Sequence, residues 1–288
     1  MDKHPEIASI IFAAGKGSRM KGFEGNKTLL PLVSGESPFN GSQPILMQIL
    51  DNLPPGPKAL VVHHKKEEVM EITRSLDLTY CEQPVLNGTG GALLASRDFI
   101  KAQDQNELII TMGDVPFVKA STYLELINEL KKSHLVVLGF KPADKKEYGV
   151  LETSGDQVTR IIEWKYWKDY SGERQKQFEI CNSGIYAVRK DDLLRYLSIL
   201  EKRPHMVLKE RGGKTVEVEE FFITDLVELI HGDDLKVGYV IAKDEDEVMG
   251  IDDLPSLTKA QKIFKESQIP FAKAEGLGSK GPRGQGFK

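Results

Sequence analysis

The chain has 288 residues, of which 40% are hydrophobic and 28% charged, with a formal net charge of −4 at pH 7. This composition predicts a globular protein with a substantial core, and the acidic balance argues against nucleic acid as the main partner. The charged N-terminus lacks a signal peptide's apolar segment, and no run approaches the roughly 18 apolar residues of a membrane span. We therefore expect a cytoplasmic protein without a membrane partner, whose Cys81 and Cys181 are buried, reduced thiols.

Apolar, β-branched runs alternate along the chain with segments of helical periodicity. The predicted strands are Ile7–Phe12, Ala59–His63, Leu108–Met112, Leu135–Phe140, Ile185–Val188 and Val237–Ala242. The predicted helices are Ile45–Leu53, Glu67–Leu76, Gly91–Ile100, Ser121–Lys132, Asp191–Leu200, Asp225–Ile230 and Leu254–Gln268. This alternation predicts an α/β fold, with a mostly parallel sheet in a Rossmann-like three-layer arrangement and helices on both faces.

The first predicted strand ends in the glycine-broken loop Ala13-Ala14-Gly15-Lys16-Gly17, which is followed by Arg19 and Lys27. Small residues let backbone N–H groups approach a polyphosphate, and the three cations can neutralise its charge, so the loop indicates a nucleotide. It has neither the Gly-Lys-Ser/Thr of a P-loop nor the third glycine of a dinucleotide fingerprint, which disfavours a nicotinamide-dependent oxidoreductase. Taken alone, a tight strand-to-helix turn with incidental charges would look similar.

A second glycine turn, Gly88-Thr89-Gly90, follows Gln83 and precedes a predicted helix. Such a turn can press its backbone against a flat polar ligand such as a base. The alternative is an ordinary helix N-terminus with Thr89 as its cap.

Two carboxylates are candidates for holding a divalent cation. Asp114 follows Gly113 at the end of a strongly hydrophobic strand, and Asp252 supplies a second carboxylate near the end of the chain. Magnesium takes one or two protein carboxylates together with phosphate oxygens. Asp114 can alternatively be a turn residue, and we interpret the acidic run Asp244–Glu247 as a solvated face.

Polar residues in the second half of the chain can contact a sugar. Glu163 and Asn182 can hydrogen-bond to sugar hydroxyls, and Lys165 can approach a sugar phosphate. Each of them, taken in isolation, is equally compatible with an ordinary surface position.

Taken in order, these segments resemble the nucleotidyltransferases that make nucleoside-diphosphate sugars. The resemblance is strongest to the uridyltransferase domain of bifunctional N-acetylglucosamine-1-phosphate uridyltransferases, and it runs from about Ile7 to Gln268. The motifs that carry it are Ala-Ala-Gly-x-Gly-x-Arg-Met with Lys27, Gly-Thr-Gly, Gly-Asp-Val-Pro, Glu163-x-Lys165, Glu173-Arg174-Gln175, Asn182-Ser183-Gly184, Ile223-Thr224-Asp225 and Gly250-Ile251-Asp252.

The resemblance implies a role for each matched position. The residues implied to line the nucleotide or read its base are Ala13, Ala14, Gly15, Gln83, Gly88, Thr89 and Gly113. Those implied to act on its phosphates are Lys16, Arg19 and Lys27, and those implied to hold Mg²⁺ are Asp114 and Asp252. Those implied to contact the sugar are Gly149, Glu163, Lys165, Asn182 and Thr224.

The implied reaction joins a nucleoside triphosphate, UTP first, to N-acetylglucosamine 1-phosphate or glucose 1-phosphate. Pyrophosphate leaves without a covalent enzyme intermediate. The alternative is a catalytically silent sugar-nucleotide sensor or regulatory subunit of the same fold. We expect one domain over residues 1–271, with a nucleotide-binding half over about 1–140, a sugar-binding half over about 141–255, and a disordered tail over 272–288.

Three features depart from the family pattern. Asp252 stands where the uridyltransferases usually have Asn, although related sugar nucleotidyltransferases use a carboxylate there. The Gly/Ser/Pro-rich segment Ser34–Gln43, expected to be a mobile loop, and the segment Pro84–Asn87 alter loops near the site. No hexapeptide repeats follow Gln268, so acetyl transfer to glucosamine phosphate is not expected.

Overall fold

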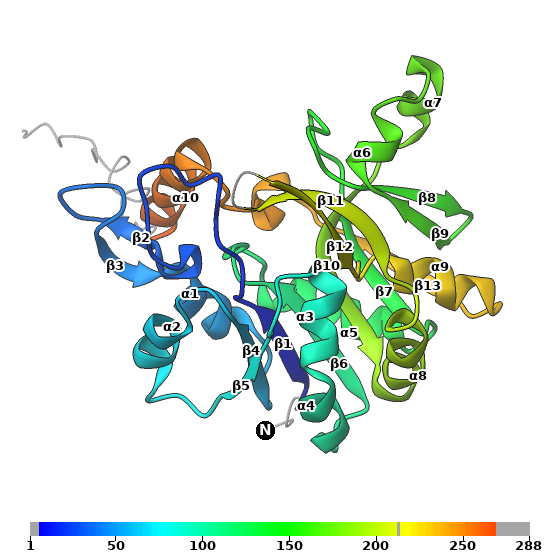
Figure 1. The fold of residues 1–288 in the computed structure, drawn as a ribbon, viewed down its shortest axis with the longest axis horizontal. Helices are drawn as coiled ribbons and strands as arrows, with labels where there is room; N and C mark the ends of the chain where they lie inside the picture. The colour runs from blue at the N-terminus through cyan, green and yellow to red at the C-terminus, as the bar shows by residue number, and fades with distance from the viewer. Residues whose placement is uncertain (1–5, 212–213, 269–288) are drawn as a thin grey trace, which may run out of the picture.

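The computed structural model describes residues 6–211 and 214–268. The strands of its central sheet are β1 (Ala8–Phe12), β4 (Lys58–Val62), β5 (Thr79–Glu82), β6 (Glu107–Met112), β7 (Leu135–Phe140), β8 (Val150–Ser154), β9 (Gln157–Ile162), β10 (Cys181–Arg189) and β13 (Val237–Ile241). Seven of them follow the order β13-β7-β10-β6-β1-β4-β5 (Figure 1), while β8 pairs with β10 and β9.

The sheet is mostly parallel. The pairs β1–β4, β1–β6, β4–β5 and β7–β13 run parallel, and β10 lies antiparallel between β6 and β7. In the β1–β6 pair, Phe12 lies opposite Met112, so these two strands end side by side. The loops that follow them therefore emerge together at one edge of the sheet.

Helices cover both faces of the sheet. The helices of the described residues are α1 (Ile45–Asn52), α2 (Lys66–Thr73), α3 (Thr89–Ala95), α4 (Arg97–Ala102), α5 (Ala120–Leu130), α6 (Trp164–Trp167), α7 (Gly172–Gln177), α8 (Lys190–Leu200), α9 (Asp225–Gly232) and α10 (Leu254–Ser267), of which α6 and α7 project beyond β8 and β9 (Figure 1). Side chains alternate between the faces of a strand: Ile11 packs in a core with α1, α5 and α10, and Ile10 packs in another with α3, α4, α8 and α9 (Figure 1). The predicted three-layer α/β fold is confirmed.

Two predicted elements differ in detail. The helix expected over Gly91–Ile100 is two helices, α3 and α4, separated at Ser96, whose hydroxyl donates to the carbonyl oxygen of Ala92 (3.1 Å). The strand expected over Ile185–Val188 is the longer β10, whose pairing with β7 is irregular between Asn182 and Tyr186. Sequence pattern alone does not reveal this irregularity, because it depends on the positive φ of Gly184 (+80°).

Strands β5 and β9, helices α6 and α7, two hairpins outside the central sheet and two short 3₁₀ turns were not predicted. The segment expected to be a loop, Ser34–Gln43, includes the end of β2 (Pro31–Ser34) and most of β3 (Gly41–Pro44), and these two strands pair as a hairpin. A second hairpin consists of β11 (His205–Arg211) and β12 (Lys214–Glu220). The 3₁₀ turns are η1 (Lys27–Leu29) and η2 (Glu245–Val248). The expected tail over 272–288 lies outside the described residues.

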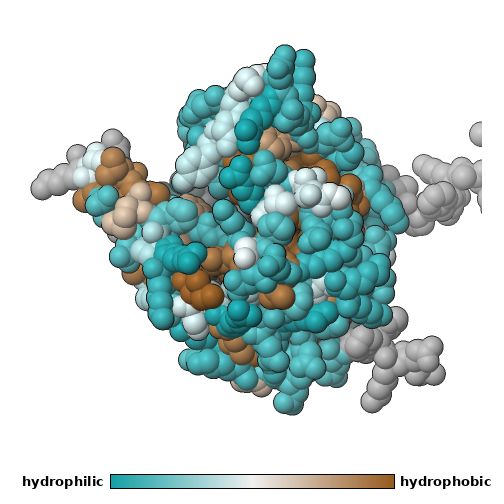
Figure 2. All heavy atoms as spheres, turned by 90° about the vertical axis from the view of Figure 1, so that its right-hand side faces the viewer, coloured by the Kyte–Doolittle hydropathy of each residue, from teal (hydrophilic) through white to brown (hydrophobic). Residues whose placement is uncertain are grey.

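The two cysteines and the surface have the character that the composition predicts. Cys81 and Cys181 are free and buried, as expected, and burial raises the pKa of the Cys181 thiol to about 12. The side of the molecule drawn in Figure 2 is mainly hydrophilic, with apolar residues in separate small groups. Within the described ranges, no helix combines the length and apolarity needed to cross a membrane.

Candidate active site

The site begins where β1 and β6 end. The backbone N–H of Gly113 donates to the carbonyl oxygen of Phe12 (3.0 Å). A Cβ at position 113 would lie 2.6 Å from that oxygen, so only glycine lets the two strand ends approach this closely. The glycine loop after Phe12 and the carboxylate of Asp114 consequently lie next to each other, as expected for adjacent parallel strands.

Lys27 bridges the two predicted metal carboxylates. Its Nζ lies 2.5 Å from Oδ2 of Asp114 and 2.7 Å from Oδ1 of Asp252. Asp252 reaches this place because the N–H of Ile251 donates to the carbonyl oxygen of Asp114 (2.9 Å). Burial disfavours the charged ammonium, but the two carboxylates together outweigh that effect and raise the pKa of Lys27. Lys27 is therefore firmly cationic.

Asn26, which the sequence analysis missed, holds Lys27 in place. Its buried amide Nδ2 donates to the carbonyl oxygens of Ala13 (3.0 Å) and His64 (2.8 Å). Its Oδ1 accepts the N–H of Thr28 (3.0 Å) and caps η1, the turn that begins with Lys27. An Asn before a short turn is a recognisable capping signal, but its bonds to Ala13 and His64 are visible only in three dimensions.

The other two predicted cations are more exposed. Arg19 approaches Oδ2 of Asp252 with its guanidinium (3.4 Å), although its side chain is 66% exposed. Lys16 and Gly15 are exposed in the same loop, while Ala13 and Ala14 are buried at its base. The structure thus gathers Arg19, Lys27, Asp114 and Asp252, with Lys16 at the rim.

The second glycine turn is fastened to a distant segment. Gln83 is almost fully buried, and its Nε2 donates to the carbonyl oxygen of Gly88 (3.2 Å). Helix α3 begins at Thr89 without a side-chain cap, so the alternative interpretation of this turn, in which Thr89 caps the helix, is wrong. Its hydroxyl oxygen instead accepts the N–H of Ile223 (3.1 Å), and the N–H of Gly90 donates to the carbonyl oxygen of Phe221 (2.8 Å).

Four of the predicted sugar-site residues lie together. The hydroxyl of Thr224 donates to Oε1 of Glu163 (3.0 Å), and a Cβ at Gly149 would lie 3.5 Å from Oε2 of the same carboxylate. The N–H of Asn182 donates to the carbonyl oxygen of Gly149 (2.8 Å), while its side-chain amide donates to the hydroxyl of Tyr186 (2.9 Å). Burial raises the pKa of Glu163, although the bond from Thr224 opposes the shift.

Lys165 has a different setting. Its Nζ lies 4.8 Å from the ring centroid of Tyr166 and 4.8 Å from that of Phe222, both within the range of cation–π attraction. Phe222 precedes the 223–224 segment, so Lys165 packs beside the sugar-site cluster with its charge over aromatic faces.

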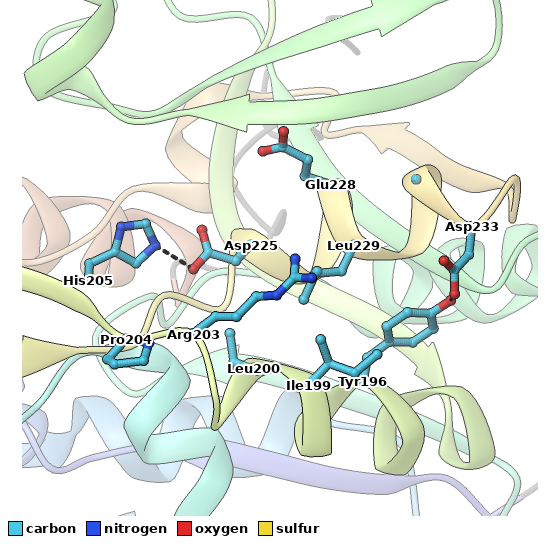
Figure 3. Close-up of a pocket in the computed structure, with 11 residues that line it drawn as sticks. Tyr196, Ile199, Leu200, Arg203, Pro204, His205, Asp225, Glu228, Leu229 and Asp233 are labelled. Atoms are coloured by element: carbon cyan, nitrogen blue, oxygen red, sulfur yellow. Dashed lines mark hydrogen bonds and ion pairs between the residues drawn. The ribbon is translucent and has the colours of Figure 1, made fainter.

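A cavity of about 580 Å³ lies behind this cluster, between α8 and α9 (Figure 3). His205 Nε2 lies 2.7 Å from Oδ2 of Asp225 on its wall, and Arg203 extends across it. Asp225 directly follows Thr224, but none of the predicted site residues lines this cavity. A second cavity of about 770 Å³ is lined by Arg19 and Asp252 and therefore opens on one of the two carboxylates that Lys27 bridges.

The paired carboxylates suit a magnesium ion completed by substrate oxygens. Oxygens of Asp114 and Asp252 already converge on a single cationic atom, Lys27 Nζ. Among the described residues, no group of three or more His, Cys, Asp or Glu side chains could hold a metal by itself. Magnesium commonly binds through one or two carboxylates plus phosphates, so the residues present fit this ion.

The family follows from comparison with known proteins. Residues 9–164 match the MobA-like NTP transferase domain, and the chain belongs to this family. It is 30% identical over 282 residues to the bifunctional protein GlmU of Sphingopyxis alaskensis (96% of this chain, 56% of that protein). It is 31% identical over 267 residues to the GlmU of Syntrophotalea carbinolica (91% and 52%). The chain thus spans about half the length of the curated relatives it matches.

Solved structures share the fold. The UDP-N-acetylglucosamine pyrophosphorylase of Trypanosoma brucei superposes with a TM-score of 0.68 at 12% identity, covering 88% of this chain and 64% of that one. A nucleotidyl transferase from Methanothermobacter gives a TM-score of 0.58 at 18% identity, covering 92% and 100%. The expected relationship to the nucleotidyltransferases is confirmed at the level of family and fold.

The interpretation of the acidic run Asp244–Glu247 as a solvated face is wrong for Glu247, although Asp244 and Glu245 are exposed. Glu247 is 4% exposed, and its carboxylate accepts bonds from α5. Local sequence gave no sign of this, because its partners Lys119 and Thr122 lie more than a hundred positions earlier.

Proposed function

We propose that this chain is a Mg²⁺-dependent nucleotidyltransferase that condenses a nucleoside triphosphate, UTP in the first place, with a sugar 1-phosphate. The sugar is N-acetylglucosamine 1-phosphate or glucose 1-phosphate, and the products are a nucleoside-diphosphate sugar and pyrophosphate. The GlmU relatives and the pyrophosphorylase fold neighbour support this choice.

The observation that carries the proposal is the Lys27 bridge between Asp114 and Asp252, beside Arg19 and the glycine loop. Cations for a polyphosphate and carboxylates for a divalent ion occupy the same edge of the sheet. Nucleotidyl transfer needs this combination, because negative charge develops on phosphate oxygens in the transition state.

The chain's own residues position the substrates and balance charge. A sugar phosphate is an adequate nucleophile at neutral pH, so attack on the α-phosphorus needs no protein base. Lys27 and Arg19, which lie beside the two carboxylates, would stabilise charge on the α-phosphate and the departing pyrophosphate. Asp114 and Asp252 would hold magnesium, which supplies further charge stabilisation at the phosphates when bound. Glu163, Asn182 and Thr224 would orient the sugar through its hydroxyls.

The test is pyrophosphate release with Mg²⁺, measured for UTP, dTTP, GTP, CTP and ATP, each paired with several sugar 1-phosphates. Turnover with one pair would establish the activity and name both substrates. Nucleotide binding without turnover in any pair would instead favour a silent sensor or regulatory subunit, and absence of both would reject the nucleotide site.

A further inference from the structure

We propose that Glu247 is a positioning residue that fixes the separation of the two metal carboxylates. The inference rests on the proposed function, since it gives Asp114 and Asp252 the role of holding magnesium. It starts from a buried carboxylate in a segment whose neighbouring acids are more exposed.

Glu247 connects η2 to the start of α5. Its side chain is 2% exposed, and Oε1 accepts the backbone N–H of Lys119 (3.1 Å) together with the hydroxyl of Thr122. Oε2 lies 3.5 Å from Lys119 Nζ. Lys119 is the N-cap of α5, where free N–H groups and the helix dipole favour a negative charge. The carboxylate is therefore held by several donors at one place.

The two tethered segments are those that carry the metal carboxylates. Asp114 lies five residues before Lys119, in the loop that leads into α5, and Asp252 lies five residues after Glu247. Between these points the N–H of Ile251 donates to the carbonyl oxygen of Asp114 (2.9 Å). Hydrogen bonds at Glu247 and at Ile251 thus join the segment of Asp252 to the segment of Asp114 at two separate points.

The chain on the C-terminal side of Asp252 is held by a separate set of hydrogen bonds at the start of α10. The hydroxyl oxygen of Ser256 accepts the N–H of Asp252 (3.0 Å), and Ser256 forms a capping box with Asp253 at the start of α10. With α10 holding one end and Glu247 the other, the Asp252 segment has little freedom to move away from Asp114. Groups that hydrogen-bond directly to metal ligands typically change metal affinity or activity about 10–100-fold when removed, and Glu247 acts on the same ligands through the backbone segments that carry them.

The experiment compares Glu247→Ala, Glu247→Gln and a control, Glu125→Gln. Glu125 lies on α5 too, but pairs with Lys243 at the surface (3.4 Å). Mn²⁺ binding is titrated by electron paramagnetic resonance in the presence of UTP, and the Mg²⁺ concentration for half-maximal pyrophosphate release is measured well below each variant's Tm. We expect Glu247→Ala to weaken Mn²⁺ binding and raise the half-maximal Mg²⁺ concentration about tenfold or more. Glu247→Gln, whose amide oxygen can still accept both bonds, should recover most of the affinity.

The outcomes separate this inference from the proposed function. If the unmodified protein neither binds Mn²⁺–UTP nor turns over, the proposed function fails. If it does both, and a folded Glu247→Ala protein has unchanged metal affinity, Glu247 is merely structural and the inference is overturned. Should Glu247→Ala not fold, Thr122→Val, which removes a single donor to Glu247, takes its place. Unchanged Mn²⁺ affinity in that variant overturns the inference equally.

Discussion

The hydroxyl of Thr224 donates to the partly buried carboxylate of Glu163 across 3.0 Å, which joins the start of α9 to the end of β9. Burial raises the pKa of Glu163, the largest influence on that group. The folded protein therefore holds this proton more tightly than the unfolded chain does. The resulting stabilisation is complete below the ordinary carboxyl pKa and is lost as the pH rises through the raised value.

Glu163→Gln should accordingly raise Tm at pH 8 relative to the unmodified protein, and this gain should vanish near pH 4. The same change should lower kcat/KM for the sugar phosphate about tenfold or more, because a charged hydrogen-bond acceptor is lost. Thermal unfolding across pH and steady-state kinetics check both effects. Glu179→Gln is the control: Lys141 lowers the pKa of Glu179, so its replacement should give no gain at pH 8. A Tm gain at pH 8 in both variants would show that burial of the Glu163 carboxylate is not the cause of the gain.

Lys27→Met should reduce turnover about a hundredfold or more, because it removes a charge placed at the phosphates. It should also destabilise the folded protein, since Asp114 and Asp252 would face each other without a shared cation. Added Mg²⁺ should then raise the Tm of this variant more than that of the unmodified protein, as measured by thermal shift. The exposed Lys21, changed to Met, serves as the control in the same loop. Equal Mg²⁺ responses in all three proteins would speak against a cation site between the carboxylates.

The two carboxylates should differ in their tolerance of an amide. Asp114 lies closer to Lys27 and is less exposed (20% against 38% for Asp252), so its charge is harder to replace. In the uridyltransferases that the sequence resembles, the position of Asp252 usually holds Asn. We expect Asp114→Asn to lose about a hundredfold or more in kcat and Asp252→Asn to stay within about tenfold. Steady-state kinetics at saturating Mg²⁺ measure the difference, and the reverse order would reject this ranking.

Gly88→Ala should disrupt the packing of the second glycine turn against the segment that contains Phe221. Gly88 has φ +93°, and a Cβ there would clash with the carbonyl oxygen of Phe221. We expect a loss of about 2 kcal/mol or more in the free energy of unfolding, measured in urea, with weaker nucleotide binding. Gly155→Ala isolates the backbone contribution, because Gly155 also has positive φ (+61°) but open space around it, and it should cost about 1 kcal/mol. Equal losses in the two variants would show that contact with Phe221 contributes nothing.

Local patterns in the sequence were sufficient for much of the fold. Apolar runs predicted β1, β6 and β7 almost to the residue, because strands buried on both faces favour apolar side chains at most positions. The pairing of β1 with β6 explains the proximity of Asp114 to the glycine loop, since parallel neighbours end at the same edge.

The unpredicted parts depend on contacts between distant segments. The sequence around Glu247 indicates a surface acid, but residues at the start of α5 supply hydrogen-bond donors that hold its carboxylate in the interior. Thr89 has a residue type and a position that suit a helix cap, but its hydroxyl oxygen instead accepts a hydrogen bond from the N–H of Ile223. Nothing within a few residues of either position encodes these partners.

Strand β10 bonds to β6 along one edge and to β7 along the other. It also carries Asn182, which approaches the sugar-site cluster, while β6 leads directly to Asp114. A rigid-body movement of the first half of the chain away from the second would break the hydrogen bonds between β10 and its neighbouring strands in the middle of the sheet. The sheet therefore holds the glycine loop and the Glu163 cluster at a fixed separation, and under the proposed function substrates would enter and products would leave through the surrounding loops.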